Sequence, residues 1–204
     1  MSGTQGEQAR AWQRMLSGRR LDLLNPSPLD IEITDIAHGL ARVARWNGQT
    51  KGDHAFSVAQ HSLLVEQIFR QITADPGPDW ILAALLHDGP EYVIGDMISP
   101  FKVTLGGEYK MVEKRLQQAI HLRFSLPAEL PEKLTKAIKR ADRIAAYFEA
   151  TRLAGFDEAE AARFFGRPRG IPASGFMIEP QPAKRIQKAF LERFAAIEKT
   201  VMRI

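Results

Sequence analysis

Apolar residues recur every three or four positions along most of the chain, the spacing of one face of an α-helix. The pattern predicts helices over residues 7–16, 35–46, 55–73, 79–88, 106–124, 132–155, 157–165 and 183–200. The segment from Asp79 to Asp88 is apolar nearly all round, so we expect it at the centre of the fold. No stretch alternates clearly enough to predict a strand, and we find no internal repeat. The expected fold is all-α, with about seven to nine helices.

The composition is that of a globular domain and not of a disordered chain. The 204 residues are 45% apolar and 25% charged and include no cysteine, which excludes a disulfide scaffold and a zinc–thiolate site. No apolar run approaches the roughly 18–20 residues that a membrane span requires. The N-terminus is polar, so a signal peptide is not expected either. We therefore expect a cytoplasmic protein without a membrane partner.

Charge is distributed unevenly along the chain. Residues 1–132 contain 13 Lys and Arg against 16 Asp and Glu, whereas residues 133–204 contain 15 against 8. A basic C-terminal third can attract nucleic acid or phosphorylated small molecules. Its cations are spaced singly, as on the solvated faces of amphipathic helices, and no aromatic residues alternate with them to form a base-stacking surface. We therefore expect no nucleic acid partner.

Four polar side chains interrupt the apolar pattern of three different predicted helices. His61 and Asp142 each lie on the apolar face of their helix, and His87-Asp88 ends the most apolar helix of the chain. Burying a carboxylate without a partner costs several kcal/mol, so each Asp needs a cation or several hydrogen-bond donors. Two His and two Asp in such places predict a divalent metal with mixed nitrogen and oxygen ligands.

Each of these residues has a simpler interpretation when it is taken alone. A single His on an apolar face is more often a hydrogen-bonded core residue. Asp142 could form a salt bridge with Arg140 or Arg143, its neighbours in the chain. The order of a His, a His-Asp pair and an Asp on three helices is far more specific than any one of them.

The segments around these residues are VAQHSLLV, ALLHDGPEYVIGD and KRADRIAAYFEA, and together they resemble the HD-domain phosphohydrolase superfamily. The likeness is greatest to its 5'-deoxynucleotidase subgroup, through Arg45-Trp46, Glu91, Gly95-Asp96 and the runs SPFK and EYK. It covers roughly residues 34–150, although the Gly-Pro pair of HDGPEY departs from the subgroup. We expect a single HD domain over residues 1–204, with a core at about 34–155 and a C-terminal loop and helix at 156–204.

The resemblance implies one divalent metal ion held by His61, His87, Asp88 and Asp142. The ligand set does not distinguish Mn, Co, Fe, Zn, Ni and Mg. Asp88 and Glu91 are expected to be catalytic. Glu91 lies four residues after His87 and three after Asp88, about one helical turn onward, where a carboxylate can orient or deprotonate the attacking water.

Substrate contacts are expected from four further residues. Arg45 and Lys102 are the candidate phosphate-binding cations, because Arg45 offers a planar fork for phosphate oxygens and Lys102 follows a Ser-Pro junction near the predicted site. The resemblance assigns Trp46 and Asp96 to the reading of the sugar. Trp46 has the alternative interpretation of a core aromatic residue.

The expected activity is release of phosphate from a small-molecule nucleotide substrate, a nucleoside 5'-monophosphate and preferably a 2'-deoxyribonucleotide, by a homodimer. Three alternatives stay open: another HD phosphohydrolase acting on a cyclic nucleotide, an alarmone or a nucleoside triphosphate; a nucleotide-binding HD module without turnover; and an RNA-binding helper. The remaining histidines carry less weight. His38 is expected outside the core, His54 next to the site as an alternative contact, and His121 at the surface.

Overall fold

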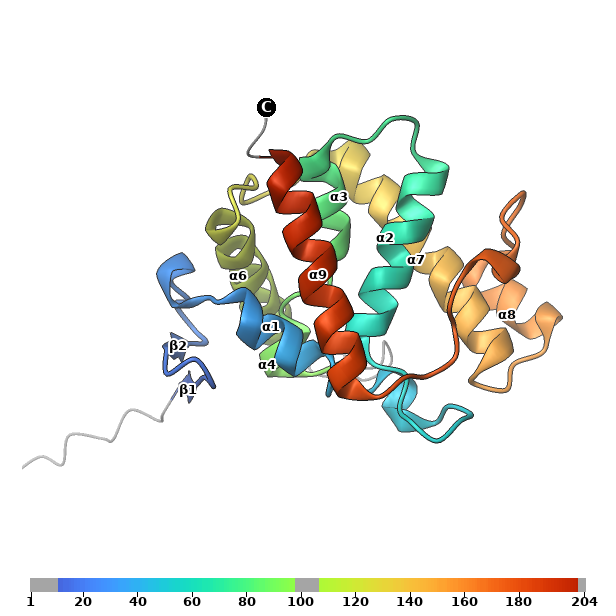
Figure 1. Cartoon of the computed structure of the whole chain (residues 1–204), viewed down its shortest axis with the longest axis horizontal. Coiled ribbons are helices and arrows are strands. Elements are labelled where there is room, and N and C mark those ends of the chain that lie inside the picture. Colours follow the sequence, from blue (N-terminus) through green and yellow to red (C-terminus); the bar gives the residue numbers. More distant parts are fainter. Residues whose placement is uncertain (1–10, 98–106, 202–204) are drawn as a thin grey trace, which may run out of the picture.

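The computed structural model describes residues 11–97 and 107–201 and is a bundle of α-helices with a small hairpin at one end (Figure 1). The α-helices in the described residues are α1 Ile33–Leu40, α2 Val58–Ile72, α3 Pro78–Leu85, α4 Glu91–Ile94, α6 Gly107–Arg123, α7 Glu132–Arg152, α8 Glu158–Phe165 and α9 Ala183–Val201. Short 3-10 turns are η1 Pro28–Asp30, η2 Arg45–Gly48 and η3 Ala173–Gly175. The prediction of an all-α fold is confirmed.

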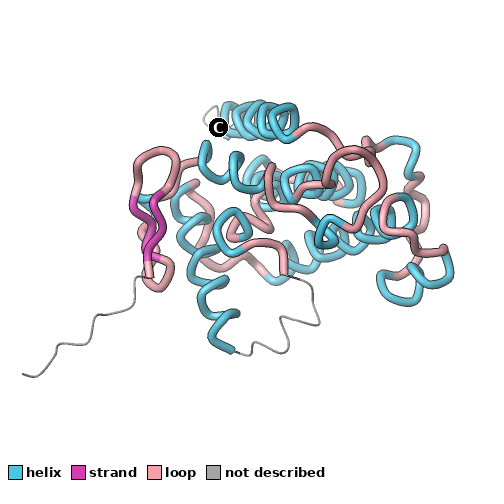
Figure 2. Tube along the Cα trace, turned by 90° about the horizontal axis from the view of Figure 1, so that it is seen from below, coloured by secondary structure: helices cyan, strands magenta, loops and turns pink. Residues whose placement is uncertain are grey.

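Helix α2 is central and packs most extensively against α7 and α3. Helix α9 lies across α1, α2 and α3, and α8 packs on α7 at the end of the molecule opposite the hairpin (Figures 1 and 2). One cluster of buried apolar side chains extends from Leu21 to Ile197, so the last helix contributes to the same core as the central ones. The division of the chain into an HD core at about 34–155 and a C-terminal loop and helix at 156–204 stays a prediction. None of the described helices combines the length and apolarity that crossing a membrane requires.

The prediction of a helix over residues 7–16 is wrong for the part that the structure describes, from residue 11 onward. Strands β1 Trp12–Arg14 and β2 Arg20–Asp22 form an antiparallel hairpin, visible in Figure 2, so the expectation that no strand is present is corrected as well. Gly18 takes a φ of +90° in its turn. Each strand has only three residues, and Leu21 alone is fully buried. Such a length is too short for alternation to be recognised in a sequence.

Helix α1 ends at Leu40, earlier than the predicted end near Trp46. The chain then turns back, and the amide of Arg45 donates to the carbonyl of Phe56 at 2.8 Å. Trp46 takes a φ of +57°, which few L-residues adopt and which prevents continuation of a helix. This reversal brings Arg45 and Trp46 to the N-terminal end of α2.

Candidate active site

His61, His87 and Asp88 come together although they lie in different elements. Ser57 caps α2 by accepting from the amide of Gln60, which places His61 in the first turn of that helix. Helix α3 ends at Leu85, and His87 and Asp88 follow in the turn after it. One ligand atom from each of His61, His87 and Asp88 lies within 4.8 Å of the others.

The two imidazoles direct their Nε2 atoms into this cluster. Nδ1 of His87 donates to the carbonyl of Ala84 at 3.0 Å, and Nδ1 of His61 donates to Glu149 at 2.5 Å. Both Nε2 atoms are buried and form no hydrogen bond with any residue that the structure describes. They lie 3.4 Å (His61) and 3.2 Å (His87) from Oδ2 of Asp88. Two imidazole nitrogens and a carboxylate around one space are a donor set that fits a divalent metal, and an anchored Nδ1 is the usual support of such a ligand.

Asp142 approaches the cluster from α7 and contacts it through His61, outside the group of three ligand atoms. Its Oδ1 lies 3.2 Å from Nε2 of His61, and its side chain is 37% exposed. The alternative salt bridge is not formed, because neither Arg140 nor Arg143 pairs with it in the described part of the chain. Asp142 therefore faces His61 in the structure, and its role as a metal ligand stays a prediction.

Electrostatics in the cluster favour a positive charge beside the carboxylates. Burial and the guanidinium of Arg45 oppose protonation of His61, but Glu149, Asp142 and Asp88 outweigh them and raise its pKa well above the usual value. Burial likewise opposes ionisation of Asp88, yet His87 and His61 hold its pKa well below the usual value. A cation is thus favoured in this position, whether it is a proton on His61 or a metal ion.

Glu149 is a residue of the site that the sequence interpretation missed. It lies on α7, is completely buried and accepts hydrogen bonds from His61 and from Nε1 of Trp46, the latter at 2.9 Å. The guanidinium of Arg45 lies 3.3 Å away. In the sequence, Glu149 could have been found from its position seven residues after Asp142, because two helical turns return to the same face.

Arg45, Trp46 and Asp96 lie together next to this carboxylate. Nη1 of Arg45 is 3.5 Å from Oδ2 of Asp96, so its guanidinium lies between Asp96 and Glu149. The indole ring of Trp46 packs against Phe165 with ring centroids 5.8 Å apart. The structure therefore gathers three of the four predicted substrate residues, with Arg45 held by two carboxylates. Lys102 lies outside the described residues.

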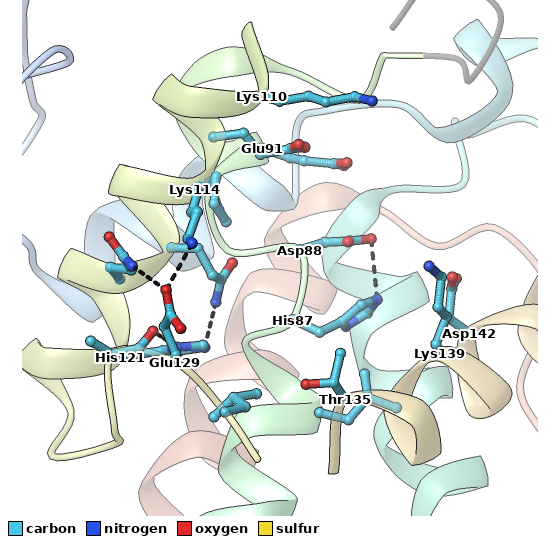
Figure 3. Close-up of a pocket in the computed structure, with 17 residues that line it drawn as sticks. His87, Asp88, Glu91, Lys110, Lys114, His121, Glu129, Thr135, Lys139 and Asp142 are labelled. Atoms are coloured by element: carbon cyan, nitrogen blue, oxygen red, sulfur yellow. Dashed lines mark hydrogen bonds and ion pairs between the residues drawn. The ribbon is translucent and has the colours of Figure 1, made fainter. Parts of the chain in front are cut away.

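A cavity of about 680 Å³ opens beside the cluster, lined by His87, Asp88, Asp142 and Glu91 and by residues of α6 and α7 (Figure 3). Glu91 begins α4 and is buried. In Figure 3 its carboxylate points to the same side as that of Asp88, and Asp142 faces them from the opposite wall.

The same cavity contains cations that were not predicted. Lys110 from α6 and Lys139 from α7 form no ion pair with any described residue, whereas Lys114 pairs with Glu129 at 2.7 Å. Figure 3 has Lys110 above Glu91 and Lys139 beside Asp142. Lys139 precedes Asp142 by three residues, one turn of the same helix, which is the signal by which it could have been found.

None of the other histidines belongs to the group of His61, His87 and Asp88, although His121 lines the same cavity. His121 is buried and not at the surface, so that expectation is wrong. Its Nδ1 donates to the carbonyl of Ala128 at 3.2 Å, and its Nε2 accepts from the amide of Gln117 at 2.7 Å. A loop after α6 covers this His, which helical periodicity alone does not reveal. His54 is exposed and His38 is partly buried.

The helical fold and the His, His-Asp and Asp cluster define a hydrolase of the HD type, a class that depends on metal. Residues 35–162 match the family described as 5'-deoxynucleotidase YfbR-like, and this match covers well over half of the chain. The chain therefore belongs to the YfbR-like family. It is also similar to a protein of Rhodobacter capsulatus described as uncharacterized, with 58% identity over 184 residues, or 90% of this chain and 94% of that protein.

Proposed function

We propose that the protein hydrolyses nucleoside 5'-monophosphates to the nucleoside and phosphate, and that it prefers 2'-deoxyribonucleotides. The observation that carries the proposal is the His61, His87 and Asp88 cluster opening into a cavity that also contains a buried Glu91 and two lysines without ion pairs. Family membership supports the choice of substrate class.

One divalent ion would be held by His61, His87, Asp88 and Asp142. When bound, such an ion polarises a phosphate oxygen and lowers the pKa of a water molecule. The nitrogen and carboxylate ligands suit several first-row metals as well as Mg²⁺, so the metal must be identified by experiment.

The chain's own residues have distinct tasks in this proposal. Lys110 and Lys139 offer positive charge to the phosphate within the same cavity as Asp88. Glu91 accepts a proton from the attacking water while the water oxygen bonds to phosphorus. The bond from phosphorus to the 5'-oxygen then breaks, and Glu91 returns its proton to that oxygen. The products are a nucleoside with a free 5'-hydroxyl and inorganic phosphate.

The proposed preference for deoxyribose rests on Trp46 and Asp96. Both side chains are tied to the buried network around Arg45 and Glu149, so they cannot adapt readily to an added group. A 2'-hydroxyl that is buried there without a partner is costly. Base identity is expected to matter little, because the sequence offers no separate set of residues that would read base edges.

The test is a phosphate-release screen over matched ribo and deoxy monophosphates, triphosphates, cyclic nucleotides and phosphorylated metabolites, each with a panel of divalent metals. The proposal expects turnover of monophosphates, with a higher kcat/KM for the deoxy member of each pair. Turnover of triphosphates or cyclic nucleotides alone would support a different HD phosphohydrolase. Metal-dependent nucleotide binding without release of phosphate would support a binding module.

A homodimer in the cytoplasm is also proposed, on the resemblance alone. Sedimentation of the metal-loaded protein at several concentrations tests the dimer. A single species with the mass of one chain at all concentrations would contradict it.

A further inference from the structure

A second cavity, of about 500 Å³, lies next to the candidate active site, between α7 and the segment after α8, and Lys139 lines both cavities. In Figure 1 this is the end of the molecule where α8 packs on α7. Six of the residues that line it are cations: Lys136, Lys139, Arg140, Arg143, Arg167 and Arg169. We call this cavity the basic cleft.

Four of the six cations that line the basic cleft have no counter-ion in the part of the chain that the structure describes. Lys139, Arg140, Arg143 and Arg169 form no ion pair and no hydrogen bond with any residue that the structure describes. Four like charges around one concavity repel one another, and this repulsion is relieved when an anion binds between them. Arg140 and Arg143 are also one turn apart, so their guanidinium groups come from the same face of α7.

The two remaining cations of the lining are each paired with a carboxylate. Lys136 pairs with Glu132 at 2.6 Å, and Arg167 pairs with Glu158. Phe165 is the one aromatic residue in the lining of the cleft, whereas a single strand requires a series of rings for stacking.

These features select a compact ligand with a high charge. Arginine forks bind phosphate oxygens in pairs, and several arginines in one small cavity match adjacent phosphoryl groups better than a single phosphate. Arg167 and Arg169 lie beyond residues 35–162, so part of the cleft comes from a segment outside the family match. We propose that the basic cleft binds the polyphosphate chain of a small phosphorylated ligand, at a site next to the candidate active-site cavity that shares Lys139 with it.

The test measures binding of inorganic tripolyphosphate, added as its magnesium complex, to the metal-loaded protein by calorimetry. The variant Arg140→Gln/Arg143→Gln should bind about 10-fold or more weakly than the unmodified protein, since hydrogen bonds between charged groups are lost. The matched control is Lys184→Gln/Lys188→Gln, which removes the same charge from exposed positions of α9 and should bind normally. Lys110→Gln, which removes a cation from the active-site cavity, should bind normally as well.

Several results would overturn the proposal. They are no binding of tripolyphosphate, equal weakening in both double variants, weakening in Lys110→Gln alone, and inorganic phosphate bound as tightly as tripolyphosphate. Tighter binding of a short single-stranded oligonucleotide, with the same dependence on Arg140 and Arg143, would assign the cleft to nucleic acid instead. A nucleoside triphosphate is titrated in parallel to identify the source of the ligand. If it binds more tightly than tripolyphosphate, and this gain in affinity is lost in Arg140→Gln/Arg143→Gln, the cleft is assigned to nucleotides.

Discussion

Nδ1 of His61 lies 2.5 Å from Oε1 of Glu149, and both side chains are completely buried. Burial alone would raise the pKa of Glu149, but the charges of His61 and Arg45 outweigh it and lower that pKa to about 2. The carboxylate therefore stays ionised and fixes the imidazole so that Nε2 faces Asp88 and Asp142. Glu149 is a positioning residue that acts through His61.

We predict that Glu149→Gln weakens metal binding by about 10- to 100-fold, because the amide supports the imidazole less well than a carboxylate does. Competition with a chelating dye measures this affinity. The matched control is Glu66→Gln. It alters a different buried carboxylate, on α2, which is ion-paired with Arg70 and Arg193 at 2.6 Å each. The control should lose stability and keep its metal affinity. Unchanged affinity in Glu149→Gln would remove this residue from the metal site.

Glu91→Gln is predicted to retain metal and lose about 100-fold or more in kcat, the usual scale for a positioned acid or base. The amide keeps the size of the buried side chain but cannot accept the proton of the attacking water. Metal content and steady-state kinetics are measured on the same preparation. Glu113→Gln, which changes another carboxylate of the same cavity, should alter kcat much less. Loss of metal together with activity would make Glu91 a ligand and not a base.

The long helices and the cluster of His and Asp could be predicted because their signals are local. Helices α2 and α7 have many consecutive turns with the same apolar face, and His61 and Asp142 stand out as polar residues on those faces. The predicted ends of the helices were less accurate. Helix α1 stops where backbone pairing of Arg45 with Phe56 replaces helical hydrogen bonds, and this pairing depends on the tertiary fold.

The missed residues depend on contacts between distant segments. Glu149 occupies an apolar run of α7, and only the packing of η2 and α2 against that helix supplies its partners. His121 lies between Ile120 and Leu122 in the sequence and is buried by a loop that comes later in the chain. Such contacts have no periodic signature in one sequence.

Gly89→Ala is predicted to destabilise the protein by about 1–3 kcal/mol, the range for overpacking a core. A Cβ at this position would lie 2.9 Å from Cδ1 of Ile120 and 3.0 Å from the carbonyl of Leu86. Because residue 89 joins Asp88 to the Glu91 helix, metal affinity should fall as well. Urea unfolding measures the stability. Gly175→Ala, where no atom lies within 4 Å of the added carbon, is the control and should be nearly neutral.

Trp46→Phe is predicted to reduce the discrimination between deoxy and ribo monophosphates by about 10-fold. The smaller ring keeps aromatic packing against Phe156 and Phe165 but leaves space near the sugar and removes the N–H that holds Glu149. Metal should be retained, because His61 still contacts Glu149. The ratio of kcat/KM values for matched substrates is the measurement. Phe156→Leu, which touches the indole but not Glu149, is the control, and an unchanged ratio in Trp46→Phe would exclude Trp46 from sugar selection.

His121 is predicted to make stability fall as the pH decreases. Burial lowers its pKa from the usual 6.5, although the carbonyls of Ala128 and Pro127 partly oppose this. Between the lowered value and 6.5 the unfolded chain binds a proton that the folded protein does not, so the free energy of unfolding decreases as the pH falls through this window. Above 6.5 the effect vanishes, because His121 is neutral in both states. Protonation would also break the hydrogen bond that Nε2 accepts from Gln117.

The measurement is the free energy of unfolding in urea between about pH 7.5 and about pH 5.5 for the unmodified protein and for His121→Gln. The variant should lose part of the pH dependence, since its amide does not titrate in this range. His54→Gln removes an exposed imidazole and is the matched control, with the pH dependence of the unmodified protein. Metal release at low pH is common to all three proteins and cancels in the comparison. Parallel curves for the unmodified protein and His121→Gln would contradict the prediction, because a buried neutral His121 must contribute a slope below its unfolded pKa.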